Sequence, residues 1–246
     1  MENSCRNAIN SFDLLPGRKL AGKFEVISKL GNGWEGEVYK VREIKTKIER
    51  AAKIFFPQRN LQEKSAKAYA QKLHKLRNCS LLIHYHTQET IVFKKSPLTV
   101  LISEYVEGIL LSEFVAKFPG ARLTPYKGLH LLYALAKGLE EVHLLREYHG
   151  DLHMDNIIVQ RFGLNFNLKL LDLFHWQAPR HENMQDDVVG LIRVFYDAIG
   201  GAKYYAKQPK NIKHICCGLR QSLILKKFKN ISQLKKHLEN LNWIEV

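Results

Sequence analysis

The residues whose types and spacing are best suited to catalysis lie in one short stretch, Tyr-His-Gly-Asp-Leu-His-Met-Asp-Asn at positions 148–156. A long helical pattern precedes this stretch and the apolar residues 157–159 follow it, so it forms a loop between a helix and a short strand. Asp151 can accept a proton from a hydroxyl group, and the side-chain oxygen of Asn156 can bind Mg²⁺ on the opposite side of the turn. A proton acceptor and a metal ligand placed in this way indicate phosphoryl transfer.

This loop resembles the catalytic loop of the protein kinase superfamily, which reads H-R-D-L-x-x-x-N. The residues from His149 to Asn156 follow that pattern except at Gly150, which replaces the arginine. Gly150, together with His153, is closer to the aminoglycoside and choline kinase branch of the superfamily. The resemblance implies that Asp151 is the catalytic base and that Asn156 has a catalytic and metal-binding role.

A glycine-rich stretch upstream resembles the nucleotide-binding loop of the same superfamily. Residues 24–30 alternate like a half-buried strand and run into Gly-Asn-Gly-Trp-Glu-Gly at positions 31–36. A dinucleotide-binding fold needs a helix directly after its glycines, whereas residues 37–41 here predict a second strand. The glycines therefore form a hairpin tip, which in kinases covers the ATP phosphates. The residues that the resemblance assigns to ATP here are Gly31, Asn32, Gly33, Gly36 and, against the adenine, Val38.

The next strand, expected at residues 50–56, contains the family's A-x-K pattern as Ala51 and Lys53. The resemblance implies that Ala51 covers the adenine and that Lys53 binds the α- and β-phosphates. The family pairs this lysine with a glutamate near the middle of the following helix, which we expect at residues 60–76. Glu63 is the one acidic residue of that segment but stands near its beginning, and Tyr69 is closer to the expected place. Glu63 is a candidate partner of Lys53, and a surface position for Glu63 is the alternative.

A continuous apolar run at residues 98–103 predicts a buried strand, and Glu104–Gly108 after it resembles the kinase hinge. The resemblance implies that the hinge holds adenine through the Glu104 carbonyl and the Val106 amide. Further along, Asp172 occupies the place of the aspartate in the family's D-F-G motif, with Phe174 where the family has glycine. Asn156 and Asp172 would then hold Mg²⁺ or Mn²⁺.

The segment after Asp172 is short, and residues 173–186 contain no Ser, Thr or Tyr. Its Ala178-Pro179-Arg180 is similar to the family's A-P-E, but lies too close to Asp172 and lacks the glutamate. Asp187, rather than Asp186, is assigned the structural role of anchoring the catalytic-loop backbone.

These residues need a fold that positions them, and the resemblance implies an α+β, bilobal protein-kinase-like fold with ATP in the cleft. It has a small antiparallel β-sheet lobe with one helix and a mainly α-helical lobe. We assign an N-terminal extension to residues 1–19, the first lobe to about 20–105, the hinge to 104–108 and the second lobe to about 109–246. The remaining expected strands are 81–86, 90–94, 157–160 and 168–171. The remaining expected helices are 110–118, 125–146, 212–225 and 231–241.

The chain has 246 residues and a formal net charge of +14 at pH 7. Residues 198–238 contain no Asp or Glu but ten Lys and Arg, which is typical either of a solvated helical surface or of a face for an anionic partner. The four cysteines match neither a disulfide framework nor a zinc site. The His84-x-His86 pair is interpreted as surface histidines. With no signal peptide and no transmembrane segment expected, a cytoplasmic protein is predicted.

Three functions compete. The hinge, the A-x-K pattern and Asp187 favour a serine/threonine protein kinase that transfers the γ-phosphate of ATP to a protein hydroxyl. Gly150, His153 and the short segment after Asp172 favour a small-molecule kinase of the aminoglycoside or choline type. Phe174 and the unlocated glutamate favour a non-catalytic, kinase-shaped binding module.

Overall fold

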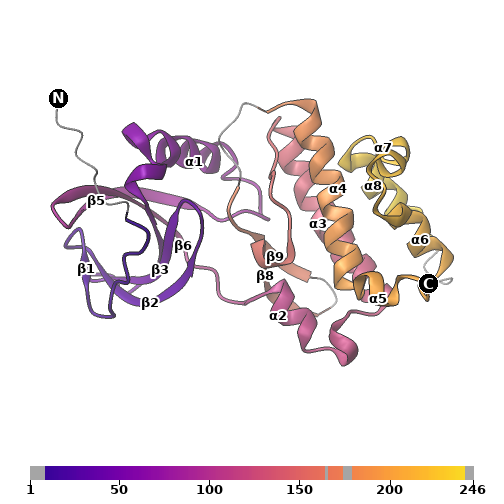
Figure 1. The fold of residues 1–246 in the computed structure, drawn as a ribbon, viewed down its shortest axis with the longest axis horizontal. Helices are drawn as coiled ribbons and strands as arrows, with labels where there is room; N and C mark the ends of the chain where they lie inside the picture. Colours follow the sequence, from indigo (N-terminus) through magenta and orange to yellow (C-terminus); the bar gives the residue numbers. More distant parts are fainter. Residues whose placement is uncertain (1–8, 164–165, 174–178, 242–246) are drawn as a thin grey trace. The chain divides into compact units, whose positions relative to one another are not determined.

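A computed structural model describes residues 9–163, 166–173 and 179–241 of the chain (Figure 1). The chain divides into two compact units. The first, called the sheet unit, comprises the residues up to Arg77 together with Ile83–Val106, and the second, called the helical unit, comprises Asn78–Leu82 and the residues from Glu107 onward. One unit is built on an antiparallel sheet and the other is mainly helical, which confirms the predicted fold class.

The sheet unit contains a six-stranded antiparallel sheet in the order β1-β2-β3-β4-β6-β5. Its strands are β1 (Lys19–Leu20), β2 (Phe24–Asn32), β3 (Gly36–Glu43), β4 (Glu49–Phe55), β5 (Tyr85–Phe93) and β6 (Ser96–Glu104). The sequence predicted two strands between residues 81 and 94, where the structure has the single strand β5. The predicted strand at residues 81–86 is wrong at its start, because Leu81 and Leu82 belong to the helical unit, within which Leu82 forms an isolated β-bridge with Leu170.

The α-helix α1 (Lys64–Lys75) of the sheet unit contacts β5 and β6. It begins later than the predicted residue 60, because Gln62 and Glu63 have left-handed backbone angles that interrupt the helical turn. Leu73 and Leu76 are buried, whereas Leu61 precedes the helix and is 69% exposed.

Residues 9–18, which precede β1, belong to the sheet unit. Phe12 and Leu14 are buried in the core of this unit, which also contains Phe56 and Phe93. The Phe12 ring lies 5.1 Å from that of Phe56 and 5.3 Å from that of Phe93, measured between ring centroids. We call residues 9–14 the N-terminal strap.

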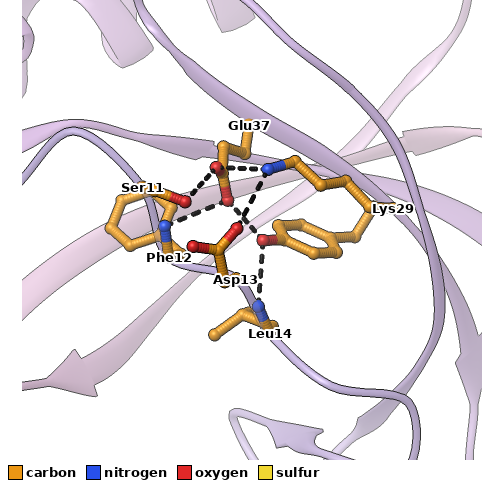
Figure 2. Close-up of polar contacts among 7 residues, drawn as sticks. Ser11, Phe12, Asp13, Leu14, Lys29 and Glu37 are labelled. Atoms are coloured by element: carbon orange, nitrogen blue, oxygen red, sulfur yellow. Dashed lines mark hydrogen bonds and ion pairs between the residues drawn. The ribbon is translucent and has the colours of Figure 1, made fainter.

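A buried carboxylate fastens the strap to the sheet (Figure 2). Glu37 of β3 accepts hydrogen bonds from the Ser11 hydroxyl at 3.0 Å, the Phe12 amide at 3.1 Å and the Lys29 ammonium at 2.6 Å. Tyr39 donates its hydroxyl to Glu37 as well, and accepts one bond from the Leu14 amide at 3.1 Å. The strap therefore uses buried hydrogen bonds in addition to its two apolar side chains.

In the helical unit, the long helix α3 (Pro125–Leu144) leads to the catalytic loop. It begins with a Thr124 cap that accepts from the Lys127 amide and with proline in its first turn, where no amide is needed. One stripe of apolar side chains along this helix is buried, namely Leu129, Leu132, Ala136, Leu139 and Val142. The loop that follows is thus attached to a helix fixed in the core.

The other helices are α2 (Leu111–Ala116), α4 (His181–Ala198), α5 (Gly201–Tyr205), α6 (Lys210–Cys216), α7 (Gln221–Lys227) and α8 (Ile231–Glu239). A three-stranded sheet joins β7 (Ile109–Leu110), β8 (Ile157–Phe162) and β9 (Phe166–Leu170). The helix predicted over residues 212–225 is two helices, because Cys217, Gly218 and Leu219 adopt left-handed angles between α6 and α7. No helix within the described ranges combines the length and the apolar character needed to cross a bilayer.

Candidate active site

Asp151 and Asn156 meet across the loop between α3 and β8. The Asn156 side-chain amide donates to the Asp151 backbone oxygen at 3.0 Å and to the Asp151 carboxylate at 3.1 Å. The Asp151 side chain is 59% exposed, whereas Asn156 is buried. Because the nitrogen of Asn156 is used in these bonds, its side-chain oxygen is the atom it can offer to a metal ion. The loop therefore presents an accessible carboxylate as a possible proton acceptor.

The backbone of the loop is anchored by Asp187 of α4. This buried carboxylate accepts from the His149 amide at 2.7 Å and from the Gly150 amide at 2.8 Å, and it lies 3.0 Å from Nε2 of His143. Gly150 has a φ of +85°, which glycine adopts without the steric cost of a side chain. The structural role predicted for Asp187, rather than for Asp186, is confirmed.

His149 connects the catalytic loop to the segment that carries Asp172. Its Nδ1 accepts from the Asp151 amide at 3.2 Å, so its proton is on Nε2, which donates to the Leu171 carbonyl at 2.8 Å. The Leu171 amide in turn donates to the Asn156 carbonyl at 2.9 Å. Asp172 directly follows Leu171, so the two predicted metal ligands stand on segments that are bonded to each other.

Asp172 is exposed and has a φ of +49°, a backbone angle in which Asp and Asn are enriched among non-glycine residues. The donor set fits Mg²⁺ or Mn²⁺, because both Asp172 and Asn156 offer oxygen, the ligand atom that hard cations prefer. Over the described part of the chain, no group of three or more His, Cys, Asp and Glu side chains is arranged for a metal ion. Asp172 and Asn156 would supply two oxygen ligands.

In the sheet unit, three of the predicted nucleotide-binding residues lie on one face of the sheet. Val38 on β3 is opposite Lys53 on β4, and Ala51 on β4 is opposite Ser103 on β6. Directly paired residues share a face, and residues two apart on a strand do too. Ala52 and Ile54, which are the neighbours of Lys53 along β4, are buried on the opposite face of the sheet, in the core that contains the strap.

The glycine-rich stretch forms a hairpin tip between β2 and β3, as predicted. Gly31 pairs with Val38 at its base, and the Gly33 amide donates to the Gly36 carbonyl at 2.9 Å. A Cβ at Gly36 would lie 2.0 Å from the backbone oxygen of Ile54, so only glycine fits this close contact with β4. Gly31 and Gly33 have open space around them, and Asn32 between them is exposed.

Lys53 forms an ion pair that the sequence did not predict. Its ammonium lies 2.9 Å from Oε2 of Glu35 in the glycine hairpin and 4.6 Å from the centroid of the Tyr69 ring on α1. The prediction that Glu63 pairs with Lys53 is wrong, because the Glu63 carboxylate accepts a hydrogen bond from the Thr99 hydroxyl at 2.9 Å. The left-handed angles at Gln62 and Glu63 place this residue before the helix. One sequence feature could have indicated Glu35 as the partner of Lys53, namely its position as an acidic residue within the glycine-rich stretch.

The predicted hinge residues Glu104 and Val106 are at the end of β6 and just beyond it, and Val106 is buried. The Glu104 amide donates to the His84 carbonyl at 2.8 Å. His84 and His86 are exposed, and His86 lies 3.0 Å from an Arg50 nitrogen, so the interpretation as surface histidines is confirmed. Phe174, which replaces the glycine of the D-F-G motif, and Ala178, the first residue of the segment similar to A-P-E, lie outside the described residues.

Comparison with known proteins identifies the family to which these features belong. The family model described as the protein kinase domain matches residues 24–198, from the start of β2 to the end of α4. The chain belongs to the protein kinase family. The matched region contains all the candidate site residues of this kinase domain.

Two curated relatives are serine/threonine-protein kinases. Pkn2 of Myxococcus xanthus is 28% identical over 154 residues, which are 62% of this chain and 18% of that protein. PrkC of Bacillus subtilis is 24% identical over 162 residues, 65% of this chain and 24% of that protein. The kinase domain therefore corresponds to a minor part of the length of these relatives.

Among solved structures, the kinase domain of Mycobacterium tuberculosis PknI matches this fold with a TM-score of 0.67 at 18% identity. The match covers 92% of this chain and 98% of that chain. At this level of identity the match shows the fold alone.

Proposed function

We propose that this protein is a serine/threonine protein kinase that transfers the γ-phosphate of ATP to a protein hydroxyl group. The observation that carries the proposal is the exposed Asp151 carboxylate, which is bonded to Asn156 on a loop whose backbone Asp187 anchors. This arrangement fixes a proton acceptor beside a metal ligand, and it occurs in a chain of the protein kinase family.

In this proposal, Asp151 orients the acceptor hydroxyl and takes its proton as the bond to phosphorus forms. Asn156 holds Asp151 in place through its amide and contributes its oxygen to the metal site with Asp172. Bound ATP supplies the phosphoryl group, and Mg²⁺ or Mn²⁺ neutralises charge on its oxygens. Little covalent chemistry is left to the protein, so positioning and electrostatics provide the rate enhancement.

The sheet unit supplies the remaining nucleotide contacts. Lys53 binds the α- and β-phosphates, and the backbone of Gly31, Asn32, Gly33 and Gly36 faces their oxygens. Val38 and Ala51 form an apolar surface for the adenine, because they lie on the same face of the sheet as Lys53. The Glu104 carbonyl and the Val106 amide bind the adenine edge.

A small-molecule kinase is the second candidate, and one contact favours it. Nε2 of His153 lies 3.6 Å from the Asp151 carboxylate, and Gly150 directly precedes Asp151 in the sequence. Gly150 and His153 are the two residues that resemble the aminoglycoside and choline kinase branch. His153 could stabilise a transferring phosphoryl group only when it is protonated, which makes it a pH-sensitive substitute for a lysine. The relatives named above favour the protein kinase.

For the basic stretch 198–238 we propose a solvated helical surface with structural lysines. The Lys213 ammonium donates to the Ala206 carbonyl at 2.7 Å, Lys227 donates to the His214 carbonyl at 2.9 Å, and Lys235 pairs with Glu140 of α3. An anionic partner on this face stays a prediction. The described cysteines Cys79, Cys216 and Cys217 are free thiols, which is in keeping with the cytoplasm as the proposed compartment.

The test is phosphate transfer from radiolabelled ATP to the protein itself, to a generic protein substrate, and to a panel of aminoglycosides and choline. We expect Mg²⁺-dependent labelling of protein, and a loss of at least about 100-fold in Asp151→Asn, because removal of the proton acceptor removes general-base catalysis. Lys53→Met should lose transfer but remain folded, since Lys53 is not a core residue. Labelling of a small molecule alone would select the second candidate, and equal rates in wild type and Asp151→Asn would refute both.

A further inference from the structure

Lys53 has a carboxylate partner on the loop that would cover the nucleotide, and not on the helix beside it. The Lys53 ammonium and the Glu35 carboxylate are 2.9 Å apart, and the two side chains are only 13% and 15% exposed. An ion pair shielded from water in this way is stronger than a pair on an open surface.

Glu35 is held in place by its own backbone. Its carbonyl accepts from the Phe56 amide at 2.8 Å, directly after β4, the strand that carries Lys53. The next residue, Gly36, lies against the Ile54 backbone of the same strand. Glu35 therefore cannot move away from Lys53 by a simple opening of the hairpin tip, because that movement would break its contacts with β4.

Helix α1 offers Lys53 an aromatic ring in place of a carboxylate. The sequence of α1 contains no Asp or Glu, and the ring of Tyr69, which is 3% exposed, lies 4.6 Å from the Lys53 ammonium. An aromatic face attracts a cation without neutralising it. Glu63, before the helix, is bonded to Thr99 on β6. The glycine hairpin thus supplies a carboxylate to Lys53, and α1 supplies an aromatic ring.

We propose that Glu35 is the positioning residue for Lys53, and that it holds the ammonium group ready for the phosphates of a nucleotide. The inference rests on the role proposed above for Lys53. An ammonium group has three N–H donors, so it can bind a phosphate oxygen while it keeps its bond to Glu35. The glycine hairpin in this chain thereby takes over a task that its kinase relatives give to a helix.

The first experiment needs no activity and no nucleotide. The purified chain is treated with an amine-acetylating reagent, and the labelling rate of Lys53 is followed by mass spectrometry in wild type, Glu35→Gln and the matched control Glu63→Gln. An amine bonded to a carboxylate stays protonated and reacts slowly, so we expect labelling of Lys53 to become about 5-fold faster in Glu35→Gln alone. Equal rates in wild type and Glu35→Gln, or acceleration in Glu63→Gln, would overturn the pairing.

The second experiment measures nucleotide use by the same variants. We expect Glu35→Gln to lower kcat/KM for Mg·ATP by about 10-fold, with partial recovery in Glu35→Asp and no change in Glu63→Gln. Tighter nucleotide binding by Glu35→Gln would overturn the proposal, because it would mean that Glu35 competes with the phosphates. A wild-type chain that transfers no phosphate would refute the proposed function, and the labelling rates would still decide whether Glu35 holds Lys53.

Discussion

At the scale of single residues, Asp187 and Asp186 are chemically identical neighbours with different surroundings. Asp187 is buried and accepts two backbone N–H groups of the catalytic loop. Asp186 is exposed, and its carboxylate accepts a long hydrogen bond of 3.5 Å from the Gln221 side-chain amide. A carboxylate that satisfies buried amides fixes the loop backbone, whereas a solvated one has little to hold.

We therefore expect Asp187→Asn to lower the rate of phosphate transfer by at least about 10-fold. The asparagine side chain would place an NH₂ group where one carboxylate oxygen now accepts a backbone N–H, and Asp151 would lose its fixed position. Asp186→Asn should transfer phosphate at the wild-type rate. The measurement is the initial rate of transfer together with circular dichroism of both variants. Equal losses in the two variants would show that the anchoring by Asp187 has no special importance.

At the scale of elements, the N-terminal strap, β2 and β3 converge on Glu37. Burial alone would raise the pKa of this carboxyl group, but the hydrogen bonds from Lys29, Tyr39, Ser11 and the Phe12 amide outweigh it and hold the pKa below its ordinary value. Burial, together with the bond to Glu37, raises the pKa of the Tyr39 hydroxyl in turn. Glu37 is therefore charged at neutral pH, and its charge stabilises the contact between strap and sheet.

A group whose pKa is lowered by folding contributes stability above its unfolded-state pKa, and this contribution is lost as the pH falls through the folded-state pKa. We expect Glu37→Gln to reduce the free energy of unfolding by about 2 kcal/mol at pH 7, since Lys29 loses its partner and the buried bonds are mismatched. The difference from wild type should shrink as the pH falls through the lowered folded-state pKa of Glu37, where the wild-type carboxylate becomes protonated.

Urea unfolding at several pH values measures this effect, and Glu89→Gln provides the control. Glu89 pairs with Lys23, whose side chain is 62% exposed, so its loss should cost about 0.5 kcal/mol or less. A Glu37→Gln variant whose deficit stays constant from pH 7 to pH 3 would contradict the role of the Glu37 charge.

At the scale of the whole molecule, we expect regulation to differ from that of many protein kinases. Such kinases become active when a phosphate on the activation loop pairs with the arginine before the catalytic aspartate. Gly150 stands at that position here, and residues 173–186 contain no Ser, Thr or Tyr. A switch that lacks both its phosphate and its cation has no differential interaction with which to shift a population.

We expect transfer activity to be independent of phosphorylation in this segment. The purified protein is treated with a phosphatase, and its rate is compared with that of the untreated protein after phosphosites have been mapped. Equal rates, or a loss that is restored by phosphorylation outside residues 173–186, agree with the prediction. A regulatory phosphate on a histidine such as His181 would contradict it.

The sequence predicted what depends on local spacing. The glycine hairpin, the strand that carries Lys53 and the anchoring by Asp187 were predicted from short motifs and from strand-like apolar patterns. The partner of Lys53 could not be predicted, because the pair joins two separate segments and the backbone at Gln62 and Glu63 leaves the helical path. The boundary at residue 19 was drawn at the Pro16-Gly17 turn, although Phe12 and Leu14 before it are buried with residues far along the chain.

The strap also constrains the order of events when the chain is made. Phe12 is synthesised well before its partners Phe56 and Phe93 and before the strand β6. Its burial is therefore a contact of long sequence separation, and closing such contacts is slow because the entropy of the intervening chain must be lost first. During translation, the first apolar residues of this kinase domain thus stay exposed until nearly the entire sheet unit has emerged, a period in which they can associate with other chains.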